Sequence, residues 1–546
     1  MSVATTAAPA RAAGPQTFAG TTELLRFALR RDRRRLVIWV LALGGLTLYS
    51  AVGLGAIYPT AAERQARAAV ISNPAGVLLS GPGFGTDDYT LGAMIANELA
   101  LTVMVAAAIM SIQLVVRHTR AEEESGRAEL VRAAAVDRRA PLTAALIETA
   151  LADAAIVAVI TAGLVGSGLA AADSLVMAGG IGITALLFGA LAAVTAQLTG
   201  HARTASGAAL AVLAAAAVVR GVGDLLREGG SALSWFSPIA WAQQTRPFVD
   251  LRLWTLLLSV AALAGLVAAS YRLVGSRDVG AGLFPPRPGP AEGGALLSGV
   301  AGLTVRLQRP SVIGWAVALL LTGMVFGSLA DDVAGMVAGN PQLAAAVGAT
   351  DDADVTAGFF AAASHYLGIA VAAFAVASVL RGQAEEASGR TEVLLATAVH
   401  RRRYLGAVLG VTLVASALLL LVGGLGTGLA AAAVSGDTGL VASEVGVQLV
   451  HLPAVLVCTG IAAALLGLAP RSAAVAWTVV AWAAVVSFFG PLLDLPGWAQ
   501  KLSPFAWLPR VPDVPLDVVP LAVLTLLGAG LIALALATFR RRDVPA

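Results

Sequence analysis

Long apolar stretches separated by short polar segments run along the whole chain of 546 residues. Each stretch is close to the roughly 20 residues that an α-helix needs to cross a bilayer. The stretches lie near residues 36–57, 93–116, 141–168, 175–199, 204–226, 252–274, 311–330, 356–380, 404–434, 440–469, 472–494 and 516–538. The pattern predicts an all-α polytopic membrane protein with about 12 transmembrane helices, six in each half.

Composition supports a membrane protein. Hydrophobic residues make up 58% of the chain and charged residues 13%, so it cannot present an ordinary charged soluble surface. The net charge is only +3 and the arginines lie beside apolar stretches, which favours a role in topology over nucleic-acid binding. The single cysteine, Cys458, excludes an intrachain disulfide and a cysteine-based metal cluster.

Arginine clusters fall on one side of the predicted topology. They precede the first span and follow the second, eighth and twelfth spans, whereas acidic runs such as 351–354 fall on the opposite side. Arginine-rich short loops stay in the cytoplasm, so both termini are expected there. Residues 1–20 contain no apolar core, and no cleavable signal peptide is expected.

One charged motif occurs twice, 263 positions apart, each time after an apolar stretch. Over the 19 residues from Ala121 to Arg139, 12 are identical in the second copy. The two copies read Glu122-Glu123-Glu124-Ser125-Gly126-Arg127-Ala128-Glu129 and Glu385-Glu386-Ala387-Ser388-Gly389-Arg390-Thr391-Glu392. An internal duplication is typical of membrane transporters built from two similar halves.

Other landmarks recur in the same order. Trp39 corresponds to Trp315, Ser237-Pro238 to Ser503-Pro504, and Arg277-Asp278-Val279 to Arg542-Asp543-Val544. The segment rich in proline and glycine after Phe284 is a natural linker. We therefore expect a disordered cytosolic tail at 1–20, a first half at 21–283 with an interface helix and six spans, a linker at 284–297 and a second such half at 298–546.

Each half is expected to begin with an amphipathic helix at the membrane interface. Leu24, Leu25 and Phe27 alternate with arginines at helical spacing, and Leu303 and its neighbours repeat the pattern. Pro310 is then predicted to begin span seven, because proline is favoured at the first position of a helix.

Two segments before the last span of each half, 226–250 and 486–514, are rich in tryptophan, proline and apolar residues. Aromatic residues of this kind commonly mark the membrane interface. Short helices that dip partway back into the outer leaflet fit the same pattern, and both interpretations remain open.

The duplicated motif is interpreted either as a contact surface or as a solvated loop whose charges only fix topology. On a continuous helix Glu123 would pair with Arg127, and Glu386 with Arg390, at a spacing of four. In an alternative arrangement Ser125 caps a new short helix that begins at Gly126. The presence of two copies favours the contact surface.

Ionisable and polar residues inside the spans are expensive to bury and are functional candidates. A cavity-lining role and a buried structural role are both open for them. For Arg220 and Asp224, four apart in one span, mutual neutralisation is the simpler interpretation. The candidates for a translocation pathway are Asn97, Glu98, Glu148, Asp153, His365 and Tyr366.

Motifs for catalysis are missing from the sequence. A phosphate-binding Gly-x-x-x-x-Gly-Lys-Ser/Thr loop cannot occur because Lys501, the only lysine, lies outside such a motif. The five histidines are scattered and show no metal-ligand spacing. We expect no catalytic residue, no metal centre and no cofactor in this chain.

These features resemble the type-2 ABC exporter permeases. The resemblance rests on six spans per half, an interface helix before the first span, a charged segment between spans two and three, and a Ser-Pro region before span six. More closely, Ser-Gly-Arg-x-Glu at 125–129 and 388–392, together with the segment 277–283, is similar to actinobacterial permeases described as polyketide-antibiotic or multidrug exporters. The resemblance covers almost the whole chain.

The resemblance implies a fused two-half permease in a bacterial cell membrane that exports hydrophobic or amphiphilic small molecules. ATP and Mg²⁺ would be bound by two copies of a separate cytosolic ABC ATPase, so the chain itself would not be an enzyme. The contacts to that ATPase are carried over to the duplicated motif: Glu122, Glu123, Gly126, Arg127, Glu129, Glu385, Glu386, Gly389, Arg390 and Glu392.

Two alternatives remain. A proton-coupled secondary multidrug transporter also has 12 spans in two halves, although the acidic residues Glu148 and Asp153 have no counterpart in the second half. A membrane scaffold without transport activity is the third interpretation.

Overall fold

The computed structural model describes residues 18–72, 74–278, 280–284, 293–294, 297, 299–329, 352–387, 389–493, 495–511 and 516–542. The chain divides into two compact units, Met1–Pro288 and Gly289–Ala546, with the division inside the predicted linker 284–297. In the described residues, 12 helices are long and apolar enough to cross a membrane, and they coincide with the predicted stretches. The prediction of an all-α polytopic membrane fold is confirmed.

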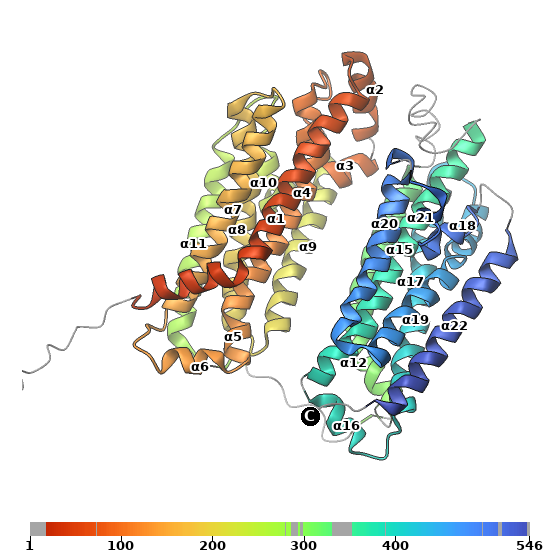
Figure 1. Cartoon of the computed structure of the whole chain (residues 1–546). Coiled ribbons are helices and arrows are strands. Elements are labelled where there is room, and N and C mark those ends of the chain that lie inside the picture. The colour runs from red at the N-terminus through yellow and green to blue at the C-terminus, as the bar shows by residue number, and fades with distance from the viewer. Residues whose placement is uncertain are drawn as a thin grey trace, which may run out of the picture. The chain divides into compact units, whose positions relative to one another are not determined.

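Unit 1 is a bundle of six long helices (Figure 1). These are α1 (Thr21–Ile57), α4 (Leu91–His118), α7 (Ala140–Gly166), α8 (Ala171–Leu198), α9 (Ala202–Leu226) and α11 (Thr255–Ser276). The short helices α5 (Arg120–Glu124) and α6 (Arg127–Arg132) lie at one end, here called the motif end, and α2 (Ala61–Ile71) and α3 (Pro74–Ser80) lie at the other. Helices α4 and α8 are the most buried, whereas α11 exposes most of its apolar surface, as expected of a helix that faces lipid.

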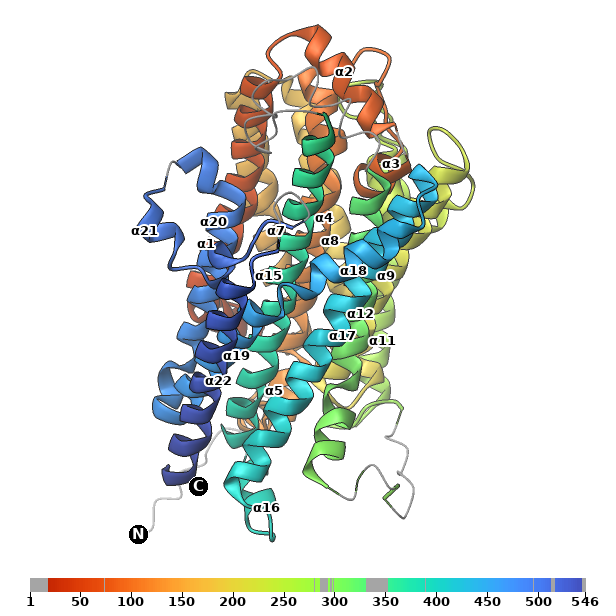
Figure 2. The same ribbon diagram turned by 90° about the vertical axis from the view of Figure 1, so that its right-hand side faces the viewer.

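Unit 2 repeats this arrangement (Figure 2). Its spans are α12 (Val300–Ser328), α15 (Asp352–Ala387), α17 (Arg401–Ser435), α18 (Gly439–Leu449) followed by α19 (Leu452–Leu468), η3 (Pro470–Val475) followed by α20 (Ala476–Leu493), and α22 (Val518–Arg541). Its motif end carries α16 (Arg390–Leu395) beyond the end of α15. The tenth span is split at His451, shortly before Pro453, which has no backbone donor for a continuous helix.

The same helix pairs pack together in both units. Helix α7 packs on α1, and α8 packs on both α4 and α11. In unit 2 the corresponding contacts join α17 to α12, and α19 to both α15 and α22. The duplication is therefore visible in the packing as well as in the sequence.

The aromatic segments before the last span of each unit contain short helices rather than simple loops. They are η1 (Ser234–Phe236) and α10 (Pro238–Gln243) in unit 1, and α21 (Gly497–Gln500) and η4 (Pro504–Trp507) in unit 2. Ser237 and Ser503 both accept a hydrogen bond at 3.3 Å from the backbone N–H two residues later. Trp241 and Trp507 both donate to a carbonyl six residues earlier, at 2.7 and 2.9 Å. The duplicated Ser-Pro landmark thus builds the same capped turn twice.

The predicted interface helices are not separate elements. Residues 21–57 form one helix, α1, whose first turns run across the bundle before it changes direction (Figure 1). In unit 2 the prediction that Pro310 begins a span is wrong, because α12 starts at Val300 and continues through it. Proline in a helix interior removes one backbone donor and bends the helix. The Arg381 guanidinium donates at 3.0 Å to the carbonyl of Leu307 in the affected turn.

Close backbone contact joins α12 to α17. Gly323 and Gly327 form a Gly-x-x-x-Gly pair, and a Cβ at Gly327 would lie 2.1 Å from the carbonyl oxygen of Thr427. Small residues allow transmembrane helices to approach closely and gain dispersion contacts.

Replacing Gly327 by valine is expected to destabilise unit 2 by about 3 kcal/mol, since the atoms in the way belong to the backbone. Gly314→Val on the same helix is the matched control, because a Cβ there meets nothing within 4 Å. The measurement is the melting temperature of the purified protein in detergent. Equal melting temperatures for the two variants would contradict the proposed contact.

Candidate functional site

Both copies of the duplicated motif fold as a helix, a glycine turn and a second short helix. We call residues 120–132 motif element 1 and residues 383–395 motif element 2. Gly126 and Gly389 have φ of 75° and 73°, in the left-handed region. A Cβ at either position would meet no atom of the described residues within 4 Å, so glycine is needed for conformation and not for space. An L-residue there would cost roughly 1–2 kcal/mol.

The arginine of each element pairs with the first glutamate of the motif. Arg127 Nε and Nη2 donate to Glu122 at 2.8 and 3.2 Å, and Arg390 donates to Glu385 at 2.5 and 3.3 Å. The predicted pairs at a spacing of four, Glu123 with Arg127 and Glu386 with Arg390, are therefore wrong. The left-handed glycine interrupts the helix, and the chain reversal brings residues five apart together.

The second glutamate of each motif pairs instead with an arginine that follows the last span of its unit. Glu123 lies 2.6 Å from Arg277, and Glu386 lies 2.5 Å from Arg542. Both arginines belong to the duplicated Arg-Asp-Val landmark. The sequence showed that this landmark recurs, but it did not indicate that its arginine pairs with the motif. Each motif element is thus tied to the end of the sixth helix of its own unit.

Motif element 1 has further ties within unit 1. Glu122 also accepts a hydrogen bond from Arg31 of α1 at 2.6 Å. Arg120 is buried and donates to the carbonyl of Ala196 near the end of α8, at 2.8 and 2.6 Å. In motif element 2, Gln383 stands at the position of Arg120 and donates to Pro470 at 2.7 Å. Movement of the element would be transmitted to several spans at once.

Ser125 does not cap the second helix. Its hydroxyl donates to the carbonyl of Glu122 at 3.1 Å, and Gly126 is the N-cap of α6, which begins at Arg127. The predicted new helix is present, but the prediction of its cap is wrong. Ser388 lies outside the described residues.

The outer face of each element presents the same kinds of side chain. Glu129 and Glu392 are exposed. Leu130 is 78% exposed, and Val393, 263 positions later, is 71% exposed. An exposed apolar residue alone needs no explanation, but here it recurs at the same position of both motif elements.

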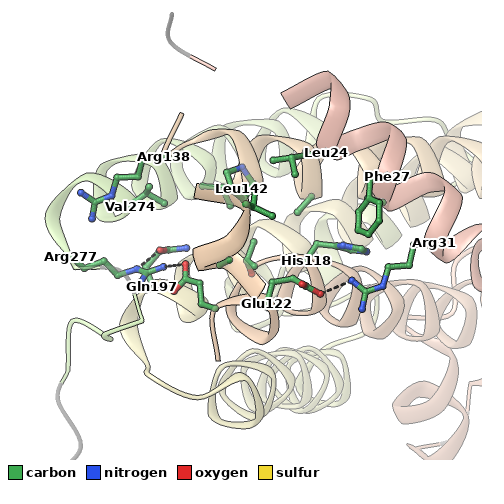
Figure 3. A pocket seen from close by; sticks show the side chains of 18 residues that line it. Leu24, Phe27, Arg31, His118, Glu122, Arg138, Leu142, Gln197, Val274 and Arg277 are labelled. Atoms are coloured by element: carbon green, nitrogen blue, oxygen red, sulfur yellow. Dashed lines mark hydrogen bonds and ion pairs between the residues drawn. The ribbon is translucent and has the colours of Figure 1, made fainter. Parts of the chain in front are cut away.

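A cavity of about 100 Å³ lies beneath motif element 1 (Figure 3). Leu24 and Phe27 of α1, His118 of α4 and Leu142 of α7 line it, and Glu122 and Arg277 lie at its polar edge. A smaller cavity of about 50 Å³ occupies the corresponding place in unit 2. The two cavities are lined by equivalent residues. Trp39 and Trp315 are 276 residues apart, and the same offset relates four lining residues of α1 to four of α12. Leu24, Phe27, Ala28 and Arg31 correspond to Val300, Leu303, Thr304 and Leu307.

The first pathway candidates, Asn97 and Glu98, lie near the start of α4, far along the helix from the motif element. Arg67 of α2 donates to both oxygens of Glu98 at 3.2 and 3.1 Å, and the Asn97 amide donates to Phe84 at 2.8 Å. Burial raises the pKa of Tyr89 beside them, and the negative charge of Glu98 acts in the same direction. This arrangement fits a structural role, since Glu98 is neutralised within unit 1.

The candidates of α7 have different surroundings. Asp153 accepts a hydrogen bond from Ser111 of α4, 3.0 Å from each carboxylate oxygen. Glu148 is fully buried and lies 3.2 Å from His118. His118 in turn lies 2.7 Å from Asp32 of α1. The sequence analysis did not select His118 or Asp32 as pathway candidates. Asp32 stands within an arginine cluster, which was interpreted only as a signal of topology.

In unit 2 the candidates are aromatic in character. The His365 ring packs edge to face against His451 and Phe505, with ring centroids 5.3 and 5.5 Å apart. The Tyr366 ring lies 6.5 Å from that of Phe326. Within unit 1, Asn97 and Glu98 therefore have other partners than Glu148 and Asp153.

The predicted neutralisation of Arg220 by Asp224 is present. The two side chains are buried and 3.3 Å apart. Asp224 also accepts from Ser234 at 2.6 Å, and Arg220 donates to the carbonyls of Val77 and Leu78. The pair joins α9 to α3 and η1 and has a structural role.

Comparison with known proteins places these features in a family. The family described as "Multidrug efflux system permease Rv1217c, C-terminal domain" matches residues 22–273 and 297–540, one segment in each half. The chain is 39% identical over 544 residues to the multidrug efflux system permease protein Rv1217c of Mycobacterium tuberculosis (strain ATCC 25618 / H37Rv). That match covers 98% of this chain and 97% of the relative, and so includes both motif elements. The chain belongs to the Rv1217c family of multidrug efflux system permeases.

Proposed function

We propose that this permease is the membrane subunit of an ABC exporter and that its two motif elements are the docking surfaces for two copies of a separate ATPase. The observation that carries the proposal is the repeated geometry of the elements. Each has a left-handed glycine, an internal Arg–Glu pair and an exposed apolar side chain at the same position. A preformed surface loses little conformational entropy on binding, which favours recognition of a partner.

The need for an energy source supports a separate ATPase. The chain has no phosphate-binding loop, because its only lysine, Lys501, lies outside any such motif. Closure of two ATPase copies on ATP would push on both elements. The ion pairs of Glu123 with Arg277 and of Glu386 with Arg542 would carry that displacement to α11 and α22.

We further propose that the motif ends face the cytoplasm and that the cargo consists of hydrophobic or amphiphilic small molecules. The orientation is supported by the arginines that gather beside the motif elements. The cargo class is supported by the name of the relative from Mycobacterium tuberculosis, which describes multidrug efflux.

The test is co-expression of the tagged permease with an ATPase encoded next to its gene. The expected result is retention of two ATPase copies per permease chain, measured by native mass spectrometry, together with ATP-dependent dye export that vanadate blocks. A permease that exports dye alone, driven by a proton gradient, would support the secondary-transporter alternative instead.

A further inference from the structure

Three buried or nearly buried side chains from three helices converge at the motif end of unit 1. Asp32 comes from α1, His118 from α4 and Glu148 from α7, and their ligand atoms all lie within 4.8 Å of one another. Asp32 is 2% exposed and Glu148 is 0% exposed. His118 also lines the cavity beneath motif element 1 (Figure 3).

Glu148 has no hydrogen-bond partner in this cluster. Among the residues that the structure describes, none donates a hydrogen bond to either of its carboxylate oxygens, although Oε2 lies 3.2 Å from His118 Nε2. That ring nitrogen already lies 2.7 Å from Asp32 Oδ2, and one N–H cannot serve both carboxylates. A buried carboxylate without a partner is costly, so Glu148 requires either a proton or a further partner at this point.

The local charge balance favours a cation. Two carboxylates face one guanidinium, since Arg117 Nε donates to Asp32 Oδ2 at 3.1 Å. Arg31, the other nearby arginine, pairs with Glu122 at 2.6 Å. With both acids ionised and a neutral imidazole, the cluster keeps one uncompensated negative charge, which a divalent ion would more than neutralise.

The donor set selects the class of ion. Two carboxylate oxygens and one imidazole nitrogen suit Zn²⁺ and similar first-row ions, whereas Ca²⁺ and Mg²⁺ prefer oxygen ligands alone. Ligands bound at about 2.0–2.2 Å in a tetrahedral site lie about 3.4 Å from one another. The observed separations around His118 Nε2 are 2.7 and 3.2 Å, and all three ligand atoms lie within 4.8 Å of one another, so the side chains must shift to reach that geometry.

We propose that Asp32, His118 and Glu148 bind one divalent transition-metal ion of the Zn²⁺ class, with a fourth position open to water from the adjoining cavity. The ion would link the helix that begins the unit, the helix that carries motif element 1, and α7. This inference is independent of the proposed ATPase docking, because it rests on the ligand atoms alone.

Unit 2 provides a natural comparison. At the offsets of 276 and 263 residues, Asp32, His118 and Glu148 correspond to Gln308, Arg381 and Val411. Gln308 donates to Thr412 at 3.4 Å, and Arg381 donates to Leu307. An amide, a guanidinium and an alkyl group cannot replace the ligands, so the three equivalent positions of unit 2 do not form a second such site.

The experiment uses the full chain purified in detergent, with its affinity tag removed and its metal stripped by a chelator. Zn²⁺ alone is titrated calorimetrically, and bound zinc is counted by elemental analysis. We expect one zinc per chain and a higher melting temperature with zinc present. Glu148→Gln and Asp32→Asn should each weaken binding by more than about tenfold, while Gln308→Ala, the matched control in unit 2, should bind like the wild type.

Co²⁺ binding to the wild-type chain tests the proposal even if a variant fails to fold. Co²⁺ bound to the wild-type chain should give the visible absorption of a nitrogen and oxygen site, and Zn²⁺ should displace it in a one-to-one ratio. Absence of saturable binding to the folded wild-type chain would overturn the proposal. Unchanged zinc binding in the folded Glu148→Gln and Asp32→Asn variants would do the same, because the metal would then lie elsewhere.

Discussion

Replacing Leu130 and Val393 together by aspartate is expected to abolish ATP-dependent export and retention of the ATPase. Both side chains are more than two thirds exposed and lie on the short helices of the motif elements. A carboxylate buried in an apolar interface loses its hydration without gaining a partner. We expect the affinity for the ATPase to fall by more than about tenfold at each element, or about 1.4 kcal/mol. The measurement is the amount of ATPase that co-purifies with the tagged permease, alongside dye export from vesicles.

The control exchanges the two side chains between the elements. Leu130→Val with Val393→Leu keeps both surfaces apolar and should retain the ATPase and export. The aspartate variant should still fold, because surface substitutions usually change stability by less than about 0.5 kcal/mol. If the aspartate variant retained the ATPase fully, the proposal that the motif elements dock the ATPase would be wrong.

The second large effect is expected from Arg127→Glu combined with Arg390→Glu. Arg127 now lies 2.8 Å from Glu122, and Arg390 lies 2.5 Å from Glu385. Each new glutamate would therefore repel the glutamate that the arginine now binds. The two arginines are 54% and 63% exposed, and solvent screens such surface pairs, so their loss should change stability little. A loss of export of more than about tenfold, with ATP hydrolysis still measurable, would then report coupling rather than unfolding.

Two controls separate a surface role from a structural one. Exchanging the partners in motif element 2, as in Glu385→Arg with Arg390→Glu, restores the ion pair with its polarity reversed and leaves Glu122, which also binds Arg31, unchanged. Export should stay low if the arginine contacts the ATPase and should recover if the pair only holds the turn. Arg252→Glu breaks the exposed 2.8 Å pair with Asp250, which lies outside both motif elements, and should leave export unchanged. Normal export in the Arg127→Glu, Arg390→Glu variant would argue against coupling at these elements.

The spans and the duplication could be predicted from the sequence because both depend on local pattern. A bilayer requires long apolar helices, so the run from 93 to 116 coincides with α4 without any knowledge of its neighbours. The recurrence of Trp39 and Trp315 likewise needs only a comparison of the chain with itself. Helix ends were less predictable: α12 begins at Val300 and continues through Pro310, which removes one backbone donor without ending the helix.

The pairing inside the motif could not be predicted from helical spacing. Gly126 adopts a left-handed conformation, which reverses the chain and exchanges the expected partner Glu123 for Glu122. Glu123 is then free to meet Arg277, 154 residues away along the chain. Such partners depend on how six helices pack and have no local signature in the sequence.

The same limit explains the acid and histidine cluster of unit 1. Asp32 and His118 are 86 residues apart in the sequence. The whole loop that contains motif element 1 lies between His118 and Glu148. Metal motifs that are recognised in sequences place their ligands a few residues apart. Only the packing of α1, α4 and α7 brings these three side chains together.

Dye export from sealed vesicles, with the permease present alone and with its ATPase, tests the central claim most directly. The account predicts export only when both proteins and ATP are present, inhibition by vanadate, and no inhibition by a protonophore. Export by the permease alone that a protonophore abolishes and vanadate leaves unchanged would contradict it.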